Sequence, residues 1–286
     1  MIPYARPKLL PNNPLVRLLT PADIPAAMRL KEAAGWNQTE TDWRNALTLA
    51  PDGCFGIECD GGLRATVTTI RFQPELAWIG MMLTDPAYRG RGFAHSLMER
   101  AIESLHRRNL YWIKLDATDM GRPVYARFGF RDEAPIERWI RTPRPVTMHS
   151  GSPLQYAPDP SLDREAFGAD RSTLLCVLSG IEAASIAGEG FAMGRPGSQA
   201  AYFGPCVARS ADAARDLVAW FLERHSKEPV CWDILPANRD AIQIARDFGF
   251  ERARELLRMA LPGIRHPEQL KNNDAMVFAI AGFEYG

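Results

Sequence analysis

The sequence predicts an α/β fold made of two similar domains in tandem, each a mixed central sheet flanked by helices. Residues 77–101 read as a strand, a glycine-bearing turn and a helix, in that order. The second half repeats the pattern of the first, because Arg127-Phe128-Gly129-Phe130 recurs as Asp247-Phe248-Gly249-Phe250. Residues 142–160, dense in Pro, Ser and Gly, read as a linker between the two. We therefore expect domains over residues 1–145 and 146–286.

Bulk composition indicates an ordinary globular protein. The 286 residues include 34 Lys and Arg and 34 Asp and Glu, so the formal net charge is zero. A sequence-independent nucleic-acid binder or a membrane-surface binder would need a basic excess, so neither partner is expected. No run approaches 18 consecutive apolar residues, and the N-terminus lacks the apolar core of a signal peptide. A cytoplasmic location is the expectation.

Cysteine and histidine usage argues against disulfides and metals. The five cysteines are odd in number and form no C-x-x-C pair, and most lie among apolar residues, as Cys176 does within 174–178. We expect buried, reduced thiols. The five histidines are scattered without metal-ligand spacing, which predicts no metal site.

The N-terminal elements follow from apolar patterning and capping residues. Residues 15–19 form an apolar strand, and Thr20-Pro21-Ala22-Asp23 begins a helix that ends near Gly35. A second short helix is expected over 42–49. Residues 54–58 and 65–72 are predicted to pair as a hairpin around a glycine turn.

The central stretch predicts an anion-binding site. Residues 78–83 form an apolar strand that Pro86 ends, and from Phe93 the apolar period becomes helical. The first N–H groups of a helix have no internal partner and favour negative charge. Gly90 and Gly92 would let the backbone approach a phosphate, and Arg89 and Arg91 add positive charge.

The remainder of the first half is a strand, a loop and a short helix. Residues 110–115 read as the strand and 116–121 as the loop. A short helix over 122–128, with a proline near its start, carries Tyr125 and ends at Gly129. Another strand is expected to begin at Phe130.

Two motifs in this order resemble those of the GCN5-related N-acetyltransferase (GNAT) superfamily. Arg89-x-x-Gly92-x-Ala94 is similar to its pyrophosphate loop, Gln/Arg-x-x-Gly-x-Gly/Ala. Tyr125 followed by Gly129-Phe130 resembles its last motif, Tyr-x-x-x-Gly-Phe. The resemblance implies an acetyl-CoA-dependent N-acetyltransferase that moves an acyl group to an amine, with no metal. A small-molecule amine acceptor is the expected partner.

The resemblance also implies roles for individual residues. The backbone from Gly90 to His95, including Phe93 and Ala94, would hold the pyrophosphate together with Arg89 and Arg91. The backbone N–H groups of Met82, Leu83 and Thr84 would grip the thioester carbonyl where two parallel strands diverge. Tyr125 would protonate the leaving thiolate; the alternative for Tyr125 is a packing or hydrogen-bonding contact to CoA without proton transfer.

The general base is not assigned by the sequence. The strands that carry a glutamate in some family members offer no carboxylate here. Asp116 or Asp119 could serve, or water could carry the proton. The Trp36-Asn37-Gln38-Thr39 segment, with Trp43, has two readings: both rings pack in the core, or the segment lines the acceptor pocket. It also resembles a segment of a bacterial tandem-domain subfamily.

The second half lacks the residues that would bind the pyrophosphate and protonate the thiolate in the first half. Arg209-Ser210-Ala211-Asp212 has no glycine, and Asp212 would repel a phosphate. Ala245 occupies the position of Tyr125. We therefore expect a degenerate second GNAT-like domain that completes the acceptor pocket or holds the first domain in place. A non-catalytic acyl-CoA sensor is the alternative function, and a homodimer is possible.

Overall fold

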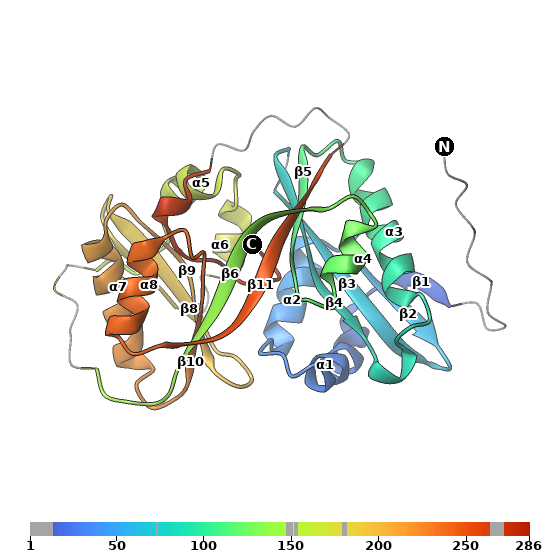
Figure 1. Cartoon of the computed structure of the whole chain (residues 1–286), viewed down its shortest axis with the longest axis horizontal. Coiled ribbons are helices and arrows are strands. Elements are labelled where there is room, and N and C mark those ends of the chain that lie inside the picture. Colours follow the sequence, from blue (N-terminus) through green and yellow to red (C-terminus); the bar gives the residue numbers. More distant parts are fainter. Residues whose placement is uncertain (1–13, 73, 147–150, 152–153, 179–181, 264–271) are drawn as a thin grey trace.

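The computed structural model describes residues 14–72, 74–146, 151, 154–178, 182–263 and 272–286. Within these residues, two lobes lie side by side and share one twelve-stranded sheet (Figure 1). The part of the predicted linker at 147–150 and 152–153 lies outside the described residues. The two halves therefore do not have separate sheets.

The first half supplies β1 (Leu15–Leu18), α1 (Ile24–Ala33), α2 (Glu40–Leu49), β2 (Cys54–Cys59), β3 (Gly62–Phe72), β4 (Leu76–Thr84), α3 (Phe93–His106), β5 (Trp112–Ala117), α4 (Arg122–Ala126) and β6 (Arg131–Arg141). The second half supplies α5 (Pro160–Phe167), α6 (Ser172–Leu178), β7 (Glu182–Ile186), β8 (Gly190–Arg195), β9 (Ala201–Ala208), α7 (Ala211–Arg224), β10 (Val230–Ile234), α8 (Arg239–Asp247), β11 (Glu251–Pro262) and β12 (Val277–Ala279).

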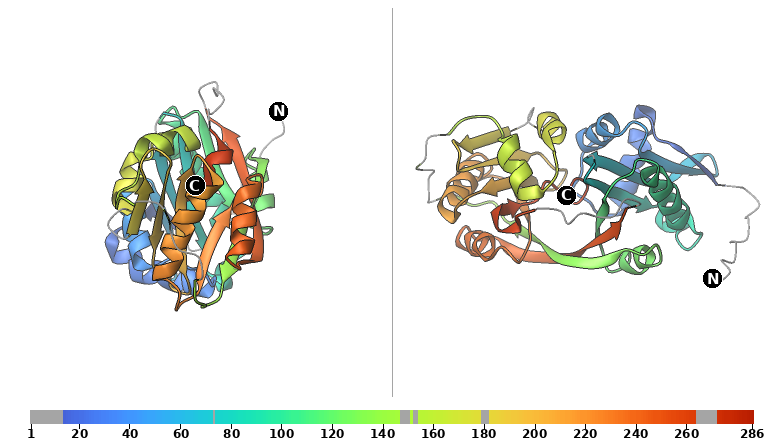
Figure 2. Two further views of the ribbon diagram at one scale, coloured as in Figure 1. Left: turned by 90° about the vertical axis from the view of Figure 1, so that its left-hand side faces the viewer. Right: turned by 90° about the horizontal axis from the view of Figure 1, so that it is seen from above.

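Capping residues set the helix starts: the cap at Thr20 was predicted, whereas the second helix begins at Glu40 and not at the expected Asp42. Thr20 forms a capping box with Asp23 ahead of α1, and Thr39 forms one with Asp42 at the start of α2. In the first lobe α1 and α2 cover one face of the sheet and α3 covers the other (Figure 2).

The expectation of a buried Cys176 is wrong. Cys176 is exposed, because residues 172–178 form a helix with only one face buried. The helical period buries Leu174, Leu175 and Leu178 and turns the intervening residue outward. Cys54, Cys206 and Cys231 are buried as expected.

The two halves exchange their last long strands. The order in the sheet is β1-β2-β3-β4-β5-β11-β6-β10-β9-β8-β7. Strand β11 of the second half therefore pairs with β5 of the first, and β6 of the first half pairs with β10 of the second. Figure 1 shows these two long strands crossing between the lobes.

The exchange has approximate two-fold symmetry. Ile136 of β6 pairs with Leu256 of β11, and these two residues occupy equivalent positions in the sequence repeat. An equivalent residue pairing with itself is the mark of a two-fold axis in an isologous contact. The two halves are thus arranged like a fused dimer.

Two buried ion pairs repeat this symmetry. Arg138 of β6 binds both oxygens of Asp233 of β10, at 2.7 and 2.6 Å. Arg258 of β11 binds both oxygens of Asp116 of β5, at 3.0 and 3.3 Å. Each pair joins an exchanged strand to the neighbour that it has in the other half.

Candidate functional site

The loop before α3 has the geometry of an anion cradle. Gly90 and Gly92 have φ values of 75° and 83°, which favour glycine. No heavy atom lies within 4 Å of a Cβ built on either glycine, so the space beside the loop is open. Gly92 is the N-cap of α3 and has no side chain to cap the helix. The amides of Phe93, Ala94 and His95 in the first turn therefore have no intrahelical acceptor.

The side chains around the loop are exposed or contact residues of the loop and the neighbouring helices. Arg89 and Arg91 are exposed. The Arg91 guanidinium lies over the Tyr88 ring at 4.5 Å and donates to the Ala87 carbonyl at 3.3 Å. The His95 ring stacks near Phe128 at 4.8 Å and approaches Glu99.

A second feature is the divergence of β4 from β5. The two strands pair in parallel only from Leu76 to Trp78 of β4. A bulge follows, marked by Met81 with a φ of 47° and by a register shift against β3. Met82, Leu83 and Thr84 belong to the part of β4 beyond its pairing with β5.

A pocket opens where the strands diverge. Ile79–Met82 of β4 and Leu115 and Asp116 of β5 form its base. Its full lining is Trp36, Gln38, Ile79, Gly80, Met81, Met82, Leu115, Asp116, Thr118, Tyr125, Arg254, Leu256, Phe283 and Glu284. The last four come from the second half, so that half closes the pocket of the first.

Tyr125 lies in this pocket, on α4. Its ring is half-buried and lies against Gly121, where an added Cβ would come within 2.8 Å of the ring. Desolvation by burial raises the pKa of Tyr125 to about 12. The phenol thus keeps its proton at neutral pH, although the same shift makes it a weaker acid than a free tyrosine.

Each of the two interpretations of the segment 36–43 holds for one of its two tryptophan rings. Trp36 lines the pocket, whereas Trp43 is buried in the core. Asn37 joins the halves, because its side chain accepts from the amides of Gln199 and Ala200 at 2.9 and 3.0 Å.

The structure bears on the two aspartates that could act as base. Asp116 lines the pocket but is held by Arg258, in the pair that Arg138 and Asp233 repeat in the other half. This repetition assigns Asp116 an architectural role. Asp119 is exposed and does not line the pocket.

Sequence reasoning missed the pocket residues of the second half, above all Glu284. The one signal in the sequence was Gly80. A Cβ there would lie 2.8 Å from the Cα of Glu284, so the C-terminal segment packs directly on β4.

In the second half, the gap between the diverging strands is filled and the N-terminus of the matching helix is capped. Strands β9 and β10 pair in parallel over Ala201–Phe203 and then diverge. Strand β12 fills the gap: it pairs with β9, and its Phe278 carbonyl accepts from the indole of Trp232 of β10 at 2.8 Å. At α7 the Ser210 hydroxyl caps the helix by accepting from Ala213 N.

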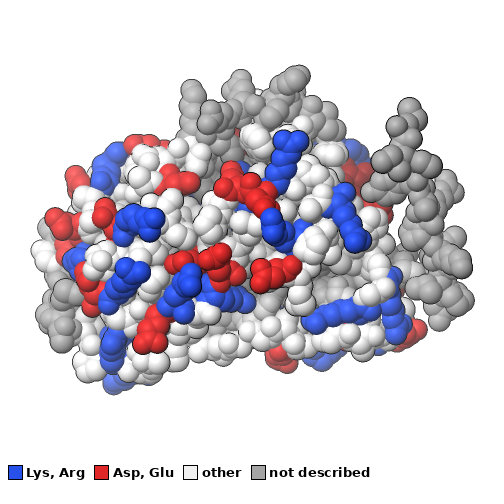
Figure 3. All heavy atoms as spheres, in the orientation of Figure 1, with Lys and Arg blue, Asp and Glu red and all other residues white. Residues whose placement is uncertain are grey.

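The predictions about metals, membranes and nucleic acids stay predictions. Among the described residues, no cluster of three or more His, Cys, Asp or Glu could hold a metal ion. No helix in the described ranges is long and apolar enough to cross a membrane. Basic and acidic side chains are mixed over the face in Figure 3, without a large patch of one sign.

A helix N-terminus beside a glycine loop, with a pocket between diverging strands, defines a fold that supports acyl transfer from acyl-CoA in general. Two family models agree with this class. The acetyltransferase (GNAT) family model matches residues 23–130, and an acetyltransferase (GNAT) domain model matches residues 160–274.

Solved structures have the same fold along nearly the whole chain. An inferred acetyltransferase from Pyrococcus horikoshii superposes with a TM-score of 0.85 at 22% identity, covering 99% of both chains. A tandem GNAT protein of the clavulanic acid biosynthesis pathway gives 0.62 at 15% identity, covering 87% of this chain and 98% of that one. A GCN5-related N-acetyltransferase from Sphaerobacter thermophilus gives 0.60 at 16% identity, covering 88% and 97%. No protein of curated function matches significantly.

The chain belongs to the GNAT superfamily and is a tandem-domain member of it.

Proposed function

We propose that the protein is an acetyl-CoA-dependent N-acetyltransferase acting on the amine of a small molecule, with its acetyl-CoA site in the first half. The pyrophosphate would be held by the backbone from Gly90 to His95, including Phe93 and Ala94, with Arg89 and Arg91 nearby. The thioester would enter the gap between β4 and β5, where amides of Met82, Leu83 and Thr84 can stabilise the oxyanion. Tyr125 is the proton donor to the leaving sulfur.

The observation that carries this proposal is the contrast between the two repeats. The first half has an uncapped helix N-terminus beside an open loop, and a pocket between its diverging strands. The second half has a side-chain cap at α7 and its own strand β12 in the gap. A small acceptor is favoured because residues of both halves line the pocket, among them Phe283 and Glu284 of the second half.

Calorimetry with acetyl-CoA tests where the cofactor binds. We expect one site per chain, and Gly92→Asp should weaken binding by about tenfold or more, equivalent to about 1.4 kcal/mol, because it places a carboxylate beside the pyrophosphate. Gly188→Asp is a matched control, since Gly188 also has a positive φ (71°) and open surroundings. Equal effects of the two variants would contradict the assignment.

Turnover is tested by thiol release from acetyl-CoA with a panel of small amines. Release that depends on one class of amine supports the proposed activity. Tight binding of acetyl-CoA without release across the panel would favour the sensor instead. A cytoplasmic location and a homodimer stay predictions.

A further inference from the structure

We propose that Glu284, in the C-terminal segment of the second half, is the general base of the site in the first half. The inference rests on the proposed acetyl transfer and deepens it. Glu284 lines the same pocket as Tyr125 and packs on Gly80 of β4. The second half would thus supply a catalytic residue as well as a wall.

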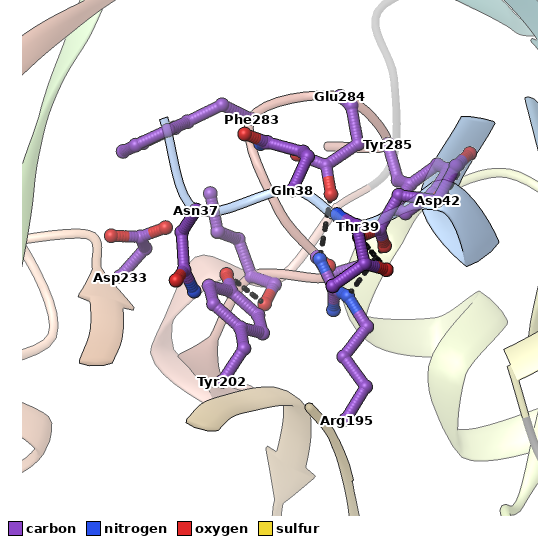
Figure 4. A network of polar contacts seen from close by, with 12 residues as sticks. Asn37, Gln38, Thr39, Asp42, Arg195, Tyr202, Asp233, Phe283, Glu284 and Tyr285 are labelled. Atoms are coloured by element: carbon purple, nitrogen blue, oxygen red, sulfur yellow. Dashed lines mark hydrogen bonds and ion pairs between the residues drawn. The ribbon is translucent and has the colours of Figure 1, made fainter. Parts of the chain in front are cut away.

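The carboxylate is held firmly but keeps room for a proton. Figure 4 shows Glu284, Gln38 and Arg195 meeting from three different parts of the chain. One Glu284 oxygen accepts from Arg195 at 2.6 Å and the other from the Gln38 amide at 2.9 Å. A carboxylate has about four lone-pair sites, so about two remain to receive an amine N–H.

The charged groups near Glu284 are two carboxylates and two guanidinium groups. Arg195 is shared between Glu284 and Asp42, which it binds at 3.0 Å, so this buried cluster has two carboxylates and one guanidinium. Arg138 is neutralised by Asp233, and Asp116 by Arg258. Arg254 of β11 also lines the pocket, and its guanidinium lies over the ring of Phe283, the neighbour of Glu284 in the sequence, at 5.5 Å. These four charges cancel, so recognition of the amine rests on hydrogen bonds to Glu284 and Gln38 and not on net charge.

A buried acceptor atom points to the same ligand. Gln38 is 8% exposed, and its Oε1 atom is buried without a hydrogen-bond partner. Because Gln38 also lines the pocket, an N–H of the acceptor amine can donate to this oxygen while another faces Glu284. Burial and the charge of Asp42 raise the pKa of Glu284, against the lowering effect of Arg195, which favours a base rather than a permanent anion.

Glu284 and Tyr125 carry the protons of the proposed reaction. Glu284 takes a proton from the ammonium group, and the freed nitrogen lone pair forms a C–N bond with the thioester carbon. The C–S bond then breaks, and Tyr125 gives its proton to the sulfur. The nitrogen loses a second proton, which restores the Tyr125 phenol, and Glu284 releases its proton to solvent.

The test is the pH dependence of turnover by the full chain and two variants. In Glu284→Gln we expect kcat/KM at about pH 7 to fall by about 10²- to 10³-fold. The loss should shrink at about pH 10, where an alkyl amine begins to deprotonate without a base. The fold should survive, because the free Oε1 of Gln38 can accept from the new amide after Gln38 turns over. Calorimetric binding of acetyl-CoA should change by no more than about twofold.

Asp42→Asn is the matched control for the network. It also removes a carboxylate from Arg195 but leaves Glu284 in the pocket. Because Asp42 raises the pKa of Glu284, its removal should move the acidic limb of the wild-type profile to lower pH. A merely structural Glu284 would give no such movement.

The outcomes separate the two proposals. If the wild type acetylates an amine and Glu284→Gln does so equally well at every pH, the base assignment is wrong and the acetyltransferase activity stands. If Glu284→Gln is equally impaired at all pH values, Glu284 has a structural role and the assignment is again wrong. If the wild type releases no thiol with any amine, both proposals fall.

Discussion

Tyr125 illustrates how the environment of a single residue sets its chemistry. The ring is held against Gly121 and faces the gap between β4 and β5. Burial raises the pKa of Tyr125 to about 12, so the phenol remains protonated as the pH rises through the neutral and mildly alkaline range. An alkaline limb below about pH 10 would therefore have to come from another group.

Replacing Tyr125 by Phe should slow the chemical step and spare binding. We expect kcat to fall by about 10²-fold, because a general acid contributes about that much, and the Kd for acetyl-CoA to stay nearly unchanged. Tyr111→Phe, a half-buried tyrosine outside the pocket, is the control. Steady-state rates and calorimetry measure the two quantities. Full turnover by Tyr125→Phe would leave this side chain only a packing contact to CoA.

At the scale of elements, the exchanged strands β6 and β11 hold the two halves in register. Each carries an arginine that is bound through two hydrogen bonds to an aspartate on a strand of the other half. Taking one partner away leaves a buried charge without compensation, which is more costly than removing both.

Arg138→Met should therefore lower the free energy of unfolding by about 3 to 5 kcal/mol. The double variant Arg138→Met with Asp233→Leu should be less destabilised than the single one, because no charge is stranded. Denaturant unfolding measures both. Arg209→Met, which breaks an exposed pair with Glu165, is the control and should have little effect. A double variant as unstable as the single would show that the cost arises from packing.

The sequence predicts what is local and misses what is paired at a distance. The loop from Arg89 to Gly92 and the helix that follows could be predicted, because turn, cap and period lie within a few residues. The strand exchange could not be predicted, because a repeated strand has the same sequence pattern whether it pairs within its own half or with the other half. Glu284 was missed for a similar reason, since the close approach at Gly80 does not identify its partner.

At the scale of the whole molecule, the exchange makes the two halves one cooperative unit. Strand β5 has its second neighbour in the other half, and so does β10. Neither lobe can unfold without exposing the sheet edge of its partner, so the chain should not behave as two independent domains.

Thermal unfolding should accordingly be a single calorimetric transition, with equal calorimetric and van't Hoff enthalpies. Acetyl-CoA at about 100 times its Kd should stabilise that transition by about 2.7 kcal/mol, although its proposed contacts lie mostly in the first half. In Gly92→Asp, which weakens binding about tenfold or more and leaves the strand exchange intact, the same concentration should stabilise by about 1.4 kcal/mol or less. Two transitions, with only one moved by the ligand, would mean that the shared strands do not couple the halves. A single transition that moves as a whole would explain why the chain needs its second half, although β12 fills the gap between that half's diverging strands. Strand β11 of the second half belongs to the sheet beside β5, and the C-terminal segment lines the pocket of the first half.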